Sequence, residues 1–427
     1  MSLNHQLLNF IQSSPTPFHA VNIMAAQLQE AGFIELDEGS AWQLLAGHKY
    51  YISRNNSSII AFQYGKKPLL EQGVRMVGAH TDSPNLKVKP RPDIHHSGYW
   101  QLGVETYGGV LLNPWFDRPL ALAGRVSFET REGYLEHVML DTKEAVGSIP
   151  SLAIHLDREA NKSRTINAQT DVPVVMAIDE AKALNFEQFL FTLIKEQSPA
   201  SDVAKILDHE MSFYEAQKGS VFGVNKEFIS ASRLDNLLSC FIGLESLINA
   251  NSDESILLVC NDHEEVGSQS AAGADGAMLE QFLRRLAGNE ESYGRMLNAS
   301  MMISVDNAHA VHPNFSNKHD KNHGPTINSG PVIKINANQR YASNAITQSI
   351  FRQCCEQVNV PVQSFVVRSD MACGSTIGPM TAANLGVKTV DVGVPQFAMH
   401  SIRETAGCDD TAYMIEALKC FYQRESL

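Results

Sequence analysis

The sequence lacks a long hydrophobic run, a cysteine-pair motif and an excess of positive charge. No stretch reaches the roughly 18 consecutive apolar residues that a membrane-spanning helix needs, so we expect no membrane partner. None of the seven cysteines forms a CxxC pair, which disfavours a cysteine zinc site and predicts reduced thiols in a core. Lys and Arg number 34 against 47 Asp and Glu, a net charge of −13, so we expect no nucleic-acid partner.

Familiar functional signatures are also missing. The N-terminus has neither the basic nor the apolar segment of a signal peptide, and we therefore expect a cytoplasmic protein. There is no P-loop and no G-x-S-x-G, and the HEE at 263–265 is not HExxH because residue 267 is Gly. The remaining composition is ordinary for a globular protein, and 427 residues are enough for two domains.

Short apolar runs alternate with helical patterns through much of the chain. Alternation of this kind predicts an α/β fold with a mixed, largely parallel sheet flanked by helices. The strands are expected at 74–80, 255–260, 301–306, 331–336, 364–367 and 388–394, and the helices at 232–248, 276–287, 345–358, 378–385 and 409–423.

Residues 89–230 interrupt this alternation. They contain a proline-rich bend and short β-like runs, followed by a segment at 186–217 that we expect to be helical. We therefore predict one domain made of residues 1–88 plus 231–427, and a second, β-rich domain inserted at 89–230.

Side chains that can bind metals follow the predicted strands or open the helix after the insertion. Because the carboxyl ends of the strands meet at one edge of an open α/β sheet, we expect these side chains to converge. Imidazole and carboxylate ligands suit zinc or another divalent first-row ion, and a site with carboxylates to spare can hold two ions. The residues concerned are His80, Asp82, Asp235, Asp262, His263, Glu264, Glu265, Asp306, His309 and His400.

Two cations about 3.5–4 Å apart usually need a carboxylate between them, and Asp235 is our candidate for that bridge. His80 with Asp306 would complete one metal site, and His400 with Glu265 would complete the other. This arrangement predicts a dinuclear metal centre.

Two further carboxylates near the predicted ligands have expected roles in catalysis. Asp82 lies two residues after His80, on the same face of a strand, where it would orient the imidazole. Glu264 would be the general base that takes a proton from a metal-activated water and passes it to a leaving amine. The residues alone thus indicate hydrolysis of an amide.

Each of these residues has a simpler alternative role. His80 would also fit a hydrogen-bonded core histidine, Asp235 a helix N-cap, and the pair Glu264–Glu265 a solvated loop. The histidines at 95–96 and at 319 and 323 are interpreted as residues of surface loops. The sequence pattern alone leaves these alternatives open.

Several long segments resemble the aspartyl aminopeptidase family, metallopeptidase family eighteen. The resemblance runs along nearly the whole chain, from SSPTPFHA through IPSLAIHLDRE to the C-terminal part. It implies a zinc-peptidase-type fold with an inserted dimerisation domain. The motifs that carry it are MVGAHTDSPNLKVKP, SRLDNLLSCF, NDHEEVGSQSAAGA, SVDNAHAVHPNF, GPVIKINANQRYASN, RSDMACGSTIGP and VGVPQFAMHSIRE.

The resemblance implies the same metal and catalytic residues as the strand-end pattern. It further implies that the substrate is contacted by Glu264, Asp306, His309, Lys334, Tyr341 and His155. His155 belongs to the inserted domain, from which it would reach a partner subunit's active site, and it is also a possible zinc residue. From the sequence alone, its apolar neighbours favour a core or strand histidine.

The activity implied is removal of N-terminal Asp or Glu from peptides. Lys334 is the candidate partner for the substrate's side-chain carboxylate, although it would equally suit the substrate backbone. We expect two divalent ions per subunit, with zinc, cobalt and manganese all compatible, and a homo-oligomer, a dodecamer built from dimers. The alternatives are a neutral aminopeptidase, a carboxypeptidase or a deacylase on the same dinuclear core, or an assembly protein with vestigial chemistry.

Overall fold

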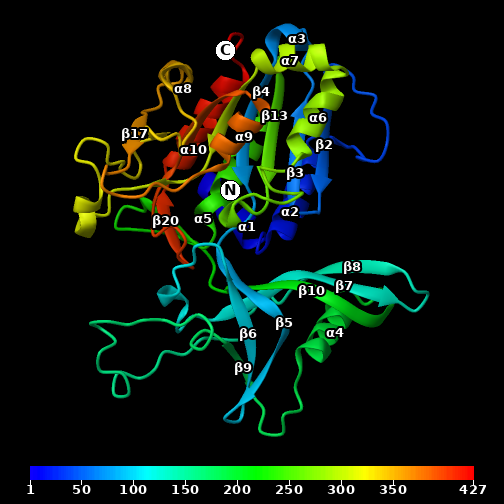
Figure 1. Ribbon diagram of the computed structural model, residues 1–427, viewed down its shortest axis with the longest axis vertical. Coiled ribbons are helices and arrows are strands. Elements are labelled where there is room, and N and C mark those ends of the chain that lie inside the picture. The colour runs from blue at the N-terminus through cyan, green and yellow to red at the C-terminus, as the bar shows by residue number, and fades with distance from the viewer. The chain divides into compact units, whose positions relative to one another are not determined.

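The computed structural model describes residues 1–427 and divides into two compact units (Figure 1). The first unit comprises Met1–Asp82, Gly219–Met399 and Glu404–Leu427, and the second comprises Ser83–Lys218 and His400–Arg403. These boundaries precede the expected ones at 88 and 230, and the return of His400–Arg403 to the second unit was not predicted. The catalytic and dimerisation roles expected of the two parts stay predictions.

A nine-stranded mixed sheet forms the centre of the first unit (Figure 1). In sheet order its strands are β1 (Ile34–Glu35), β2 (Lys49–Arg54), β3 (Ser58–Gln63), β13 (Ser255–Asn261), β4 (Val74–His80), β14 (Met301–Val305), β18 (Lys388–Gly393), β16 (Val332–Ile335) and β17 (Gln363–Val366). The neighbours β13, β4, β14 and β18 run parallel, whereas antiparallel pairs occur on either side of them. The expected mixed α/β fold is confirmed.

Helices cover both faces of this sheet. One core cluster joins the sheet to α1 (Leu3–Gln12), α2 (Pro17–Glu30), α5 (Leu234–Ile248), α8 (Ala345–Gln357) and α10 (Asp410–Tyr422). A second joins it to α3 (Leu69–Gln72), α6 (Met278–Ala287), α7 (Glu290–Asn298) and α9 (Ile377–Leu385). In β13, Leu258 belongs to the first cluster and its neighbour Leu257 to the second. The central strands are largely apolar because both of their faces are buried.

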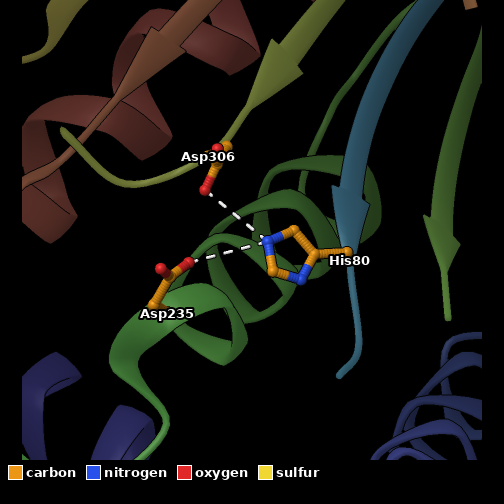
Figure 2. A group of neighbouring side chains, drawn as sticks. All are labelled: His80, Asp235 and Asp306. Atoms are coloured by element: carbon orange, nitrogen blue, oxygen red, sulfur yellow. Dashed lines mark ion pairs between the residues drawn. The ribbon is translucent and has the colours of Figure 1, made fainter. Parts of the chain in front are cut away.

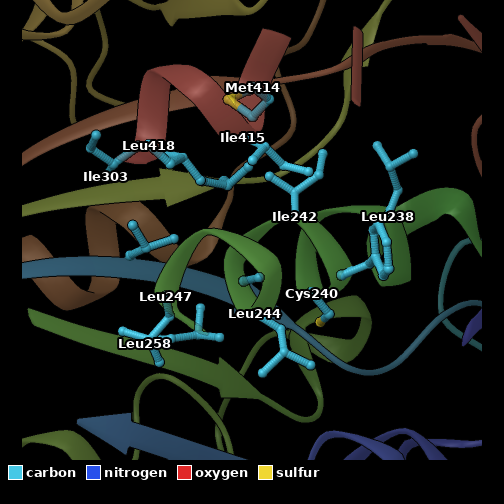
Figure 3. Close-up of a cluster of buried hydrophobic side chains, with 14 of the residues drawn as sticks. Leu238, Cys240, Ile242, Leu244, Leu247, Leu258, Ile303, Met414, Ile415 and Leu418 are labelled. Atoms are coloured by element: carbon cyan, nitrogen blue, oxygen red, sulfur yellow. The ribbon is translucent and has the colours of Figure 1, made fainter. Parts of the chain in front are cut away.

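Helix α5 packs against the sheet strands β4 and β13 and against the helix α10 (Figure 3). Leu244 and Leu247 are fully buried in the same cluster as Leu258 of β13 and Leu418 of α10. Each such side chain contributes about 1.5–3 kcal/mol of transfer free energy when it leaves water. This packing fixes the N-terminal end of α5, where Asp235 lies.

A smaller five-stranded sheet also belongs to the first unit. Its strands, in order, are β11 (Ser220–Phe222), β12 (Phe228–Ala231), β20 (Glu404–Gly407), β19 (Pro395–Phe397) and β15 (Ala308–His309). Short 3₁₀ turns, η2 (Glu264–Val266) and η3 (Pro313–Lys318), follow β13 and β15 along the chain. The sheet holds Glu404 and His309 in regular structure.

The second unit is built on a six-stranded antiparallel sheet. Its order is β8 (Leu135–Asp141), β7 (Leu120–Thr130), β10 (Val203–Glu215), β5 (Asn85–His96), β6 (Tyr99–Tyr107) and β9 (Val174–Ile178), accompanied by the helix α4 (Phe186–Gln197) and the turn η1 (Asn113–Trp115). The prediction of a helix throughout 186–217 is wrong beyond residue 197. Residues 203–215 are a strand because they pair with β7 along almost their whole length, and such non-local pairing overrides local propensity.

No helix in the structure combines the length and the apolar character needed to cross a membrane. All seven cysteines are free thiols, and four of them are buried.

Candidate metal centre

The predicted ligands of the first unit gather at the carboxyl ends of its central parallel strands. His80 is the last residue of β4, and in the sheet it is paired with Asn261, the last residue of β13. Asp306 directly follows β14. Glu264 and Glu265 begin the turn η2, which follows β13 after a short bend. The parallel pairing of β13, β4 and β14 therefore brings chemically active groups to one edge.

His80, Asp235 and Asp306 point toward one another at this edge (Figure 2). The Nε2 atom of His80 lies 3.6 Å from Oδ1 of Asp235 and 3.6 Å from Oδ1 of Asp306. The same atom lies 4.0 Å from Oε2 of Glu264. One imidazole nitrogen is therefore surrounded by three carboxylates that come from distant parts of the chain.

These separations suit ligands around a shared cation. They are longer than a hydrogen bond, which spans about 2.7–3.2 Å between nitrogen and oxygen. Two ligands held about 2.0–2.1 Å from a tetrahedral zinc ion lie roughly 3.4 Å apart. The ligand atoms of His80, Asp235 and Asp306 lie within 4.8 Å of one another, as do those of His80, Glu264 and Glu265. Nitrogen and carboxylate donors at this spacing fit a divalent first-row metal.

The backbone carbonyl of Asp82 determines which imidazole nitrogen of His80 faces the carboxylates. The Nδ1 atom of His80 lies 3.1 Å from the carbonyl oxygen of Asp82, and a carbonyl can only accept a hydrogen bond. Nδ1 therefore carries a proton and donates it, which leaves Nε2 as the nitrogen that faces the carboxylates and would bind a cation in place of a proton. A histidine that ligates a metal through Nε2 commonly donates its Nδ1–H in this way. Burial opposes protonation of His80, but the carboxylates of Glu264, Asp235, Asp306 and Asp82 outweigh it and raise the pKa of His80 well above its ordinary value.

The carboxylate of Asp82 holds the loop that carries the two glutamates. Its two oxygens accept hydrogen bonds from the backbone N–H of Glu264 and from that of Glu265, each at 3.1 Å. Its Oδ1 also lies 3.3 Å from Nδ1 of His80. We expected Asp82 to orient the imidazole. The contact with the glutamate loop was not predicted, because it joins residues almost two hundred positions apart.

Burial and mutual repulsion change the acidity of Glu264. Burial raises its pKa to about 8, and although His80 opposes this shift, the carboxylates of Asp306, Asp82 and Asp235 add to it. Negative charges that are crowded in this way favour either a proton or a cation between them.

The other acids of the cluster respond in different directions. Burial, followed by the charge of Asp235, raises the pKa of Glu265 well above its ordinary value. Burial also acts on Asp306, but the ammonium group of Lys334 and the imidazole of His80 outweigh it and hold the pKa of Asp306 well below its usual range. Asp306 therefore stays ionised more readily than Glu264 or Glu265, whose pKa values are raised.

Asp235 is supported by residues that sequence reasoning missed. Its backbone N–H donates to Oε2 of the buried Glu404, at 3.0 Å. The next residue, Asn236, donates from its side chain to the carbonyl of Val305, which precedes Asp306. A cis peptide bond joins Asp235 to Asn236. The two hydrogen bonds join segments that are far apart in the sequence, and no local pattern indicates them.

Lys334 and Tyr341, two of the expected substrate contacts, lie beside this cluster. Lys334 belongs to β16, and its Nζ atom lies 3.0 Å from Oδ2 of Asp306 and 5.5 Å from the ring of Tyr341. The backbone N–H of the residue after Tyr341, Ala342, donates to the buried carboxylate of Asp391 at 2.6 Å. Asp391 was not predicted to have any role.

His309, the third expected substrate contact, is exposed at the end of β15, where its ring packs against Phe365 with the centroids 5.7 Å apart. His155 is not a core or strand histidine, and that prediction is wrong. It lies exposed in a turn of the second unit, and its apolar neighbours Leu152, Ile154 and Leu156 are also exposed. The apolar pattern that suggested a core is therefore a surface feature.

The last predicted ligand, His400, is counted with the second unit. Its Nδ1 atom lies 3.1 Å from the carbonyl oxygen of Gly109. Its pairing with Asp235 and Glu265 stays a prediction.

The mixed α/β fold is shared with solved structures of other proteins. It superposes on a chain of the complex of Ape4 and Nbr1 with a TM-score of 0.95, at 37% identity, covering 98% of this chain and 85% of that one. The dodecamer of mApe1 from S. cerevisiae gives a TM-score of 0.85 at 27% identity and covers 99% of this chain and 96% of that one.

Sequence comparison identifies the family. The family described as aminopeptidase I zinc metalloprotease (M18) matches residues 10–422. A probable M18 family aminopeptidase 2 from Stutzerimonas stutzeri (strain A1501) is 54% identical over 427 residues, which cover 100% of this chain and 99% of that protein. The chain belongs to the M18 family of zinc metalloprotease aminopeptidases, as its motifs led us to expect.

Proposed function

We propose that the protein is a dinuclear metal aminopeptidase that removes acidic residues, Asp or Glu, from the N-termini of peptides. The observation that carries the proposal is the position of His80 Nε2, 3.6 Å from the carboxylates of both Asp235 and Asp306. His80 and Asp306 would hold one ion, Glu265 and His400 the other, and Asp235 would bridge them. Zinc is the family's metal, and the donor set also suits cobalt or manganese.

Glu264 and Asp82 have the proposed catalytic roles beside the two cations. When bound, the two cations would polarise the substrate carbonyl and lower the pKa of a water molecule. Glu264 would accept the proton from that water and deliver it to the leaving amine. Asp82 would keep Glu264 in place through its hydrogen bond to the Glu264 backbone, at 3.1 Å.

The proposed specificity for acidic residues depends on a positive charge beside the cluster. Lys334 is the buried cation beside the cluster, and the ring of Tyr341 lies next to it. Tyr341 and the exposed His309 are the other candidate substrate contacts. The pairing of Lys334 with Asp306 reduces the positive charge left for an acidic substrate, and this favours the alternative of a neutral aminopeptidase or a deacylase on the same core.

We propose that the protein forms a homo-oligomer, a dodecamer built from dimers. The similar mApe1 from S. cerevisiae is a dodecamer. The exposed apolar turn around His155 supports contact with a partner subunit, because such patches commonly mark interaction sites. We further propose a cytoplasmic location, since seven free thiols suit a reducing compartment.

The mechanism is tested by anilides of Asp, Glu and Leu, assayed before and after removal of metal by a chelator. We expect turnover of the acidic anilides to disappear on chelation and to return with zinc. Glu264→Gln should keep the metal content and lose at least about 100-fold in kcat, the usual contribution of a general base. Turnover without metal would overturn the mechanism, and a preference for the Leu anilide or cleavage of N-acetylated substrate would favour the alternative.

A mixing experiment tests whether His155 acts across subunits. Hybrids of a His155→Ala chain and an Asp235→Ala chain should recover part of the activity that each homo-oligomer lacks. If verified hybrids stay inactive, His155 acts within its own subunit or has only a structural role.

A further inference from the structure

The segment His400–Arg403 belongs to the second unit, although the residues on both sides of it belong to the first. We propose that the second unit positions His400 for cation binding, through the carbonyl of Gly109 and through the ion pair of Arg403 with Glu215. The inference rests on the proposed function, in which His400 is a metal ligand. Gly109, Arg403 and Glu215 would then be positioning residues of His400.

The first support is the hydrogen bond that selects the tautomer of His400. Its Nδ1 atom lies 3.1 Å from the carbonyl oxygen of Gly109, so this nitrogen must be the donor. Nε2 is then the ring nitrogen that would bind a cation. His80 is arranged in the same way, with Nδ1 3.1 Å from the carbonyl oxygen of Asp82. Histidine ligands of metals commonly donate their second N–H to such an oxygen.

The second support is the backbone of His400. Its φ angle is +67°, in the left-handed region that is costly for a residue with a side chain. Such a conformation persists only where surrounding contacts impose it. Here the N–H of Leu111 donates to the carbonyl of His400 at 3.1 Å, and Ile402 is buried in the core of the second unit.

The third support is the ion pair that ends the segment. Nε of Arg403 lies 2.8 Å from Oε2 of Glu215 in β10, and their side chains are 13% and 0% exposed. Arg118 binds the other oxygen of Glu215 at 2.9 Å, and Arg403 also donates to the carbonyls of Gln217 and Lys218. Loss of one partner would leave a buried charge without compensation, so the pair strongly constrains the residues next to it.

Gly109 also makes room for the imidazole. A Cβ atom added at this position would lie 3.0 Å from Nδ1 and 3.4 Å from Cε1 of His400. Gly109 does not have a left-handed φ, so replacement by alanine would act through this contact and not through backbone strain. We expect the methyl group of Gly109→Ala to displace the ring.

The experiment measures zinc per subunit in full-length Gly109→Ala and Glu215→Gln proteins, dialysed against a series of buffered free zinc concentrations. Two matched controls come from the same unit. The control for Gly109→Ala is Gly103→Ala, whose added Cβ would lie 3.5 Å from Ile94, an ordinary contact. The control for Glu215→Gln is Glu210→Gln in the same strand, β10, which removes an ion pair with Arg125 of β7. The affinity for one of the two ions should fall 10- to 100-fold in the test variants and stay at the wild-type value in the controls.

A His400→Ala protein, measured in parallel, separates this inference from the proposed function. If it binds two ions with wild-type affinity, the proposed ligand set is wrong. If it loses one ion while Gly109→Ala and Glu215→Gln retain both with wild-type affinity, the positioning role is overturned. Should Glu215→Gln fail to fold, Gly109→Ala decides the question, because it leaves the buried ion pair intact.

Discussion

The ammonium group of Lys334 lies 3.0 Å from the carboxylate of Asp306, and the two side chains are only 4% and 12% exposed. The other oxygen of Asp306 faces the imidazole of His80 at 3.6 Å. Asp306 is therefore fixed from both sides, and Lys334 orients a proposed metal ligand whether or not it also meets the substrate.

Replacement of Lys334 by methionine tests which role dominates. Because the variant leaves the buried Asp306 without its ammonium partner, we expect kcat/KM to fall at least about 100-fold, equivalent to roughly 3 kcal/mol. The decrease should be similar for Asp, Glu and Leu anilides, because the variant disturbs Asp306, a proposed metal ligand on which the turnover of every substrate depends. Steady-state kinetics on the three substrates provides the measurement.

The control for this variant is Lys419→Met, which removes a surface ion pair of the same length, 3.0 Å, with Glu416. Surface pairs contribute little, so its kinetics should match the wild type. A loss in Lys334→Met that is confined to the acidic anilides would show that substrate recognition is its main task.

Asp82→Asn should slow catalysis without removing a metal ligand. The substitution turns one acceptor into an amide that faces a backbone N–H of Glu264 or Glu265, so the loop with the proposed base loses a hydrogen bond. We expect kcat to fall 10- to 100-fold, as for other residues that orient ligands. The exposed loop residue Asp37 accepts from the N–H of Gly39, and Asp37→Asn is the control. Equal kinetics in the two variants would contradict the positioning role.

Zinc binding should release protons near neutral pH. In the absence of a cation the pKa of Glu264 is about 8, chiefly because of burial, so this group carries a proton at pH 7. A cation favours the ionised form and expels the proton, so affinity should increase as the pH rises from 6 to 8. Calorimetry of zinc binding at pH 7, in buffers with different ionisation enthalpies, counts the protons. Glu264→Gln should release fewer, and an unchanged count would exclude Glu264 as their source.

The strands of the main sheet were predictable because their apolar runs are continuous. Val74–His80 and Ser255–Asn261 are buried along their whole length, and a short run without alternation is what a doubly covered strand requires. The same property made the strand-end residues His80 and Asp306 recognisable, since each is a polar residue at the end of such a run.

Local pattern failed where distant contacts decide the structure. Residues 203–215 form a strand only through their pairing with β7, and Asp82 meets Glu264 and Glu265 only because β4 and β13 are neighbours. His155 shows the opposite error, in which apolar neighbours indicated a core although they lie on the surface. Glu404 and Asp391 act through backbone groups of other segments, and such contacts have no sequence motif.

Asp391 offers a test of how the loop beside Lys334 is held. Its carboxylate is fully buried and accepts hydrogen bonds from the N–H of Ala342 and from Oγ1 of Thr376, both at 2.6 Å. Asp391→Asn would replace one acceptor by a donor that faces a donor, at a cost of about 1–3 kcal/mol. The segment of Tyr341 and Ala342, which we call the Tyr341 loop, should become more mobile because its hydrogen bond to residue 391 is lost. We expect KM to rise about tenfold, with a smaller change in kcat.

Asp410→Asn is the matched control for Asp391→Asn. Asp410 is also a buried carboxylate that accepts two backbone N–H groups, those of Asn328 at 2.6 Å and Gly330 at 2.9 Å, but it does not contact the Tyr341 loop. Both variants should therefore lower the temperature of thermal inactivation, whereas only Asp391→Asn should raise KM. If KM rises equally in both, general destabilisation explains the effect, and the proposed link from Asp391 to the substrate site is wrong.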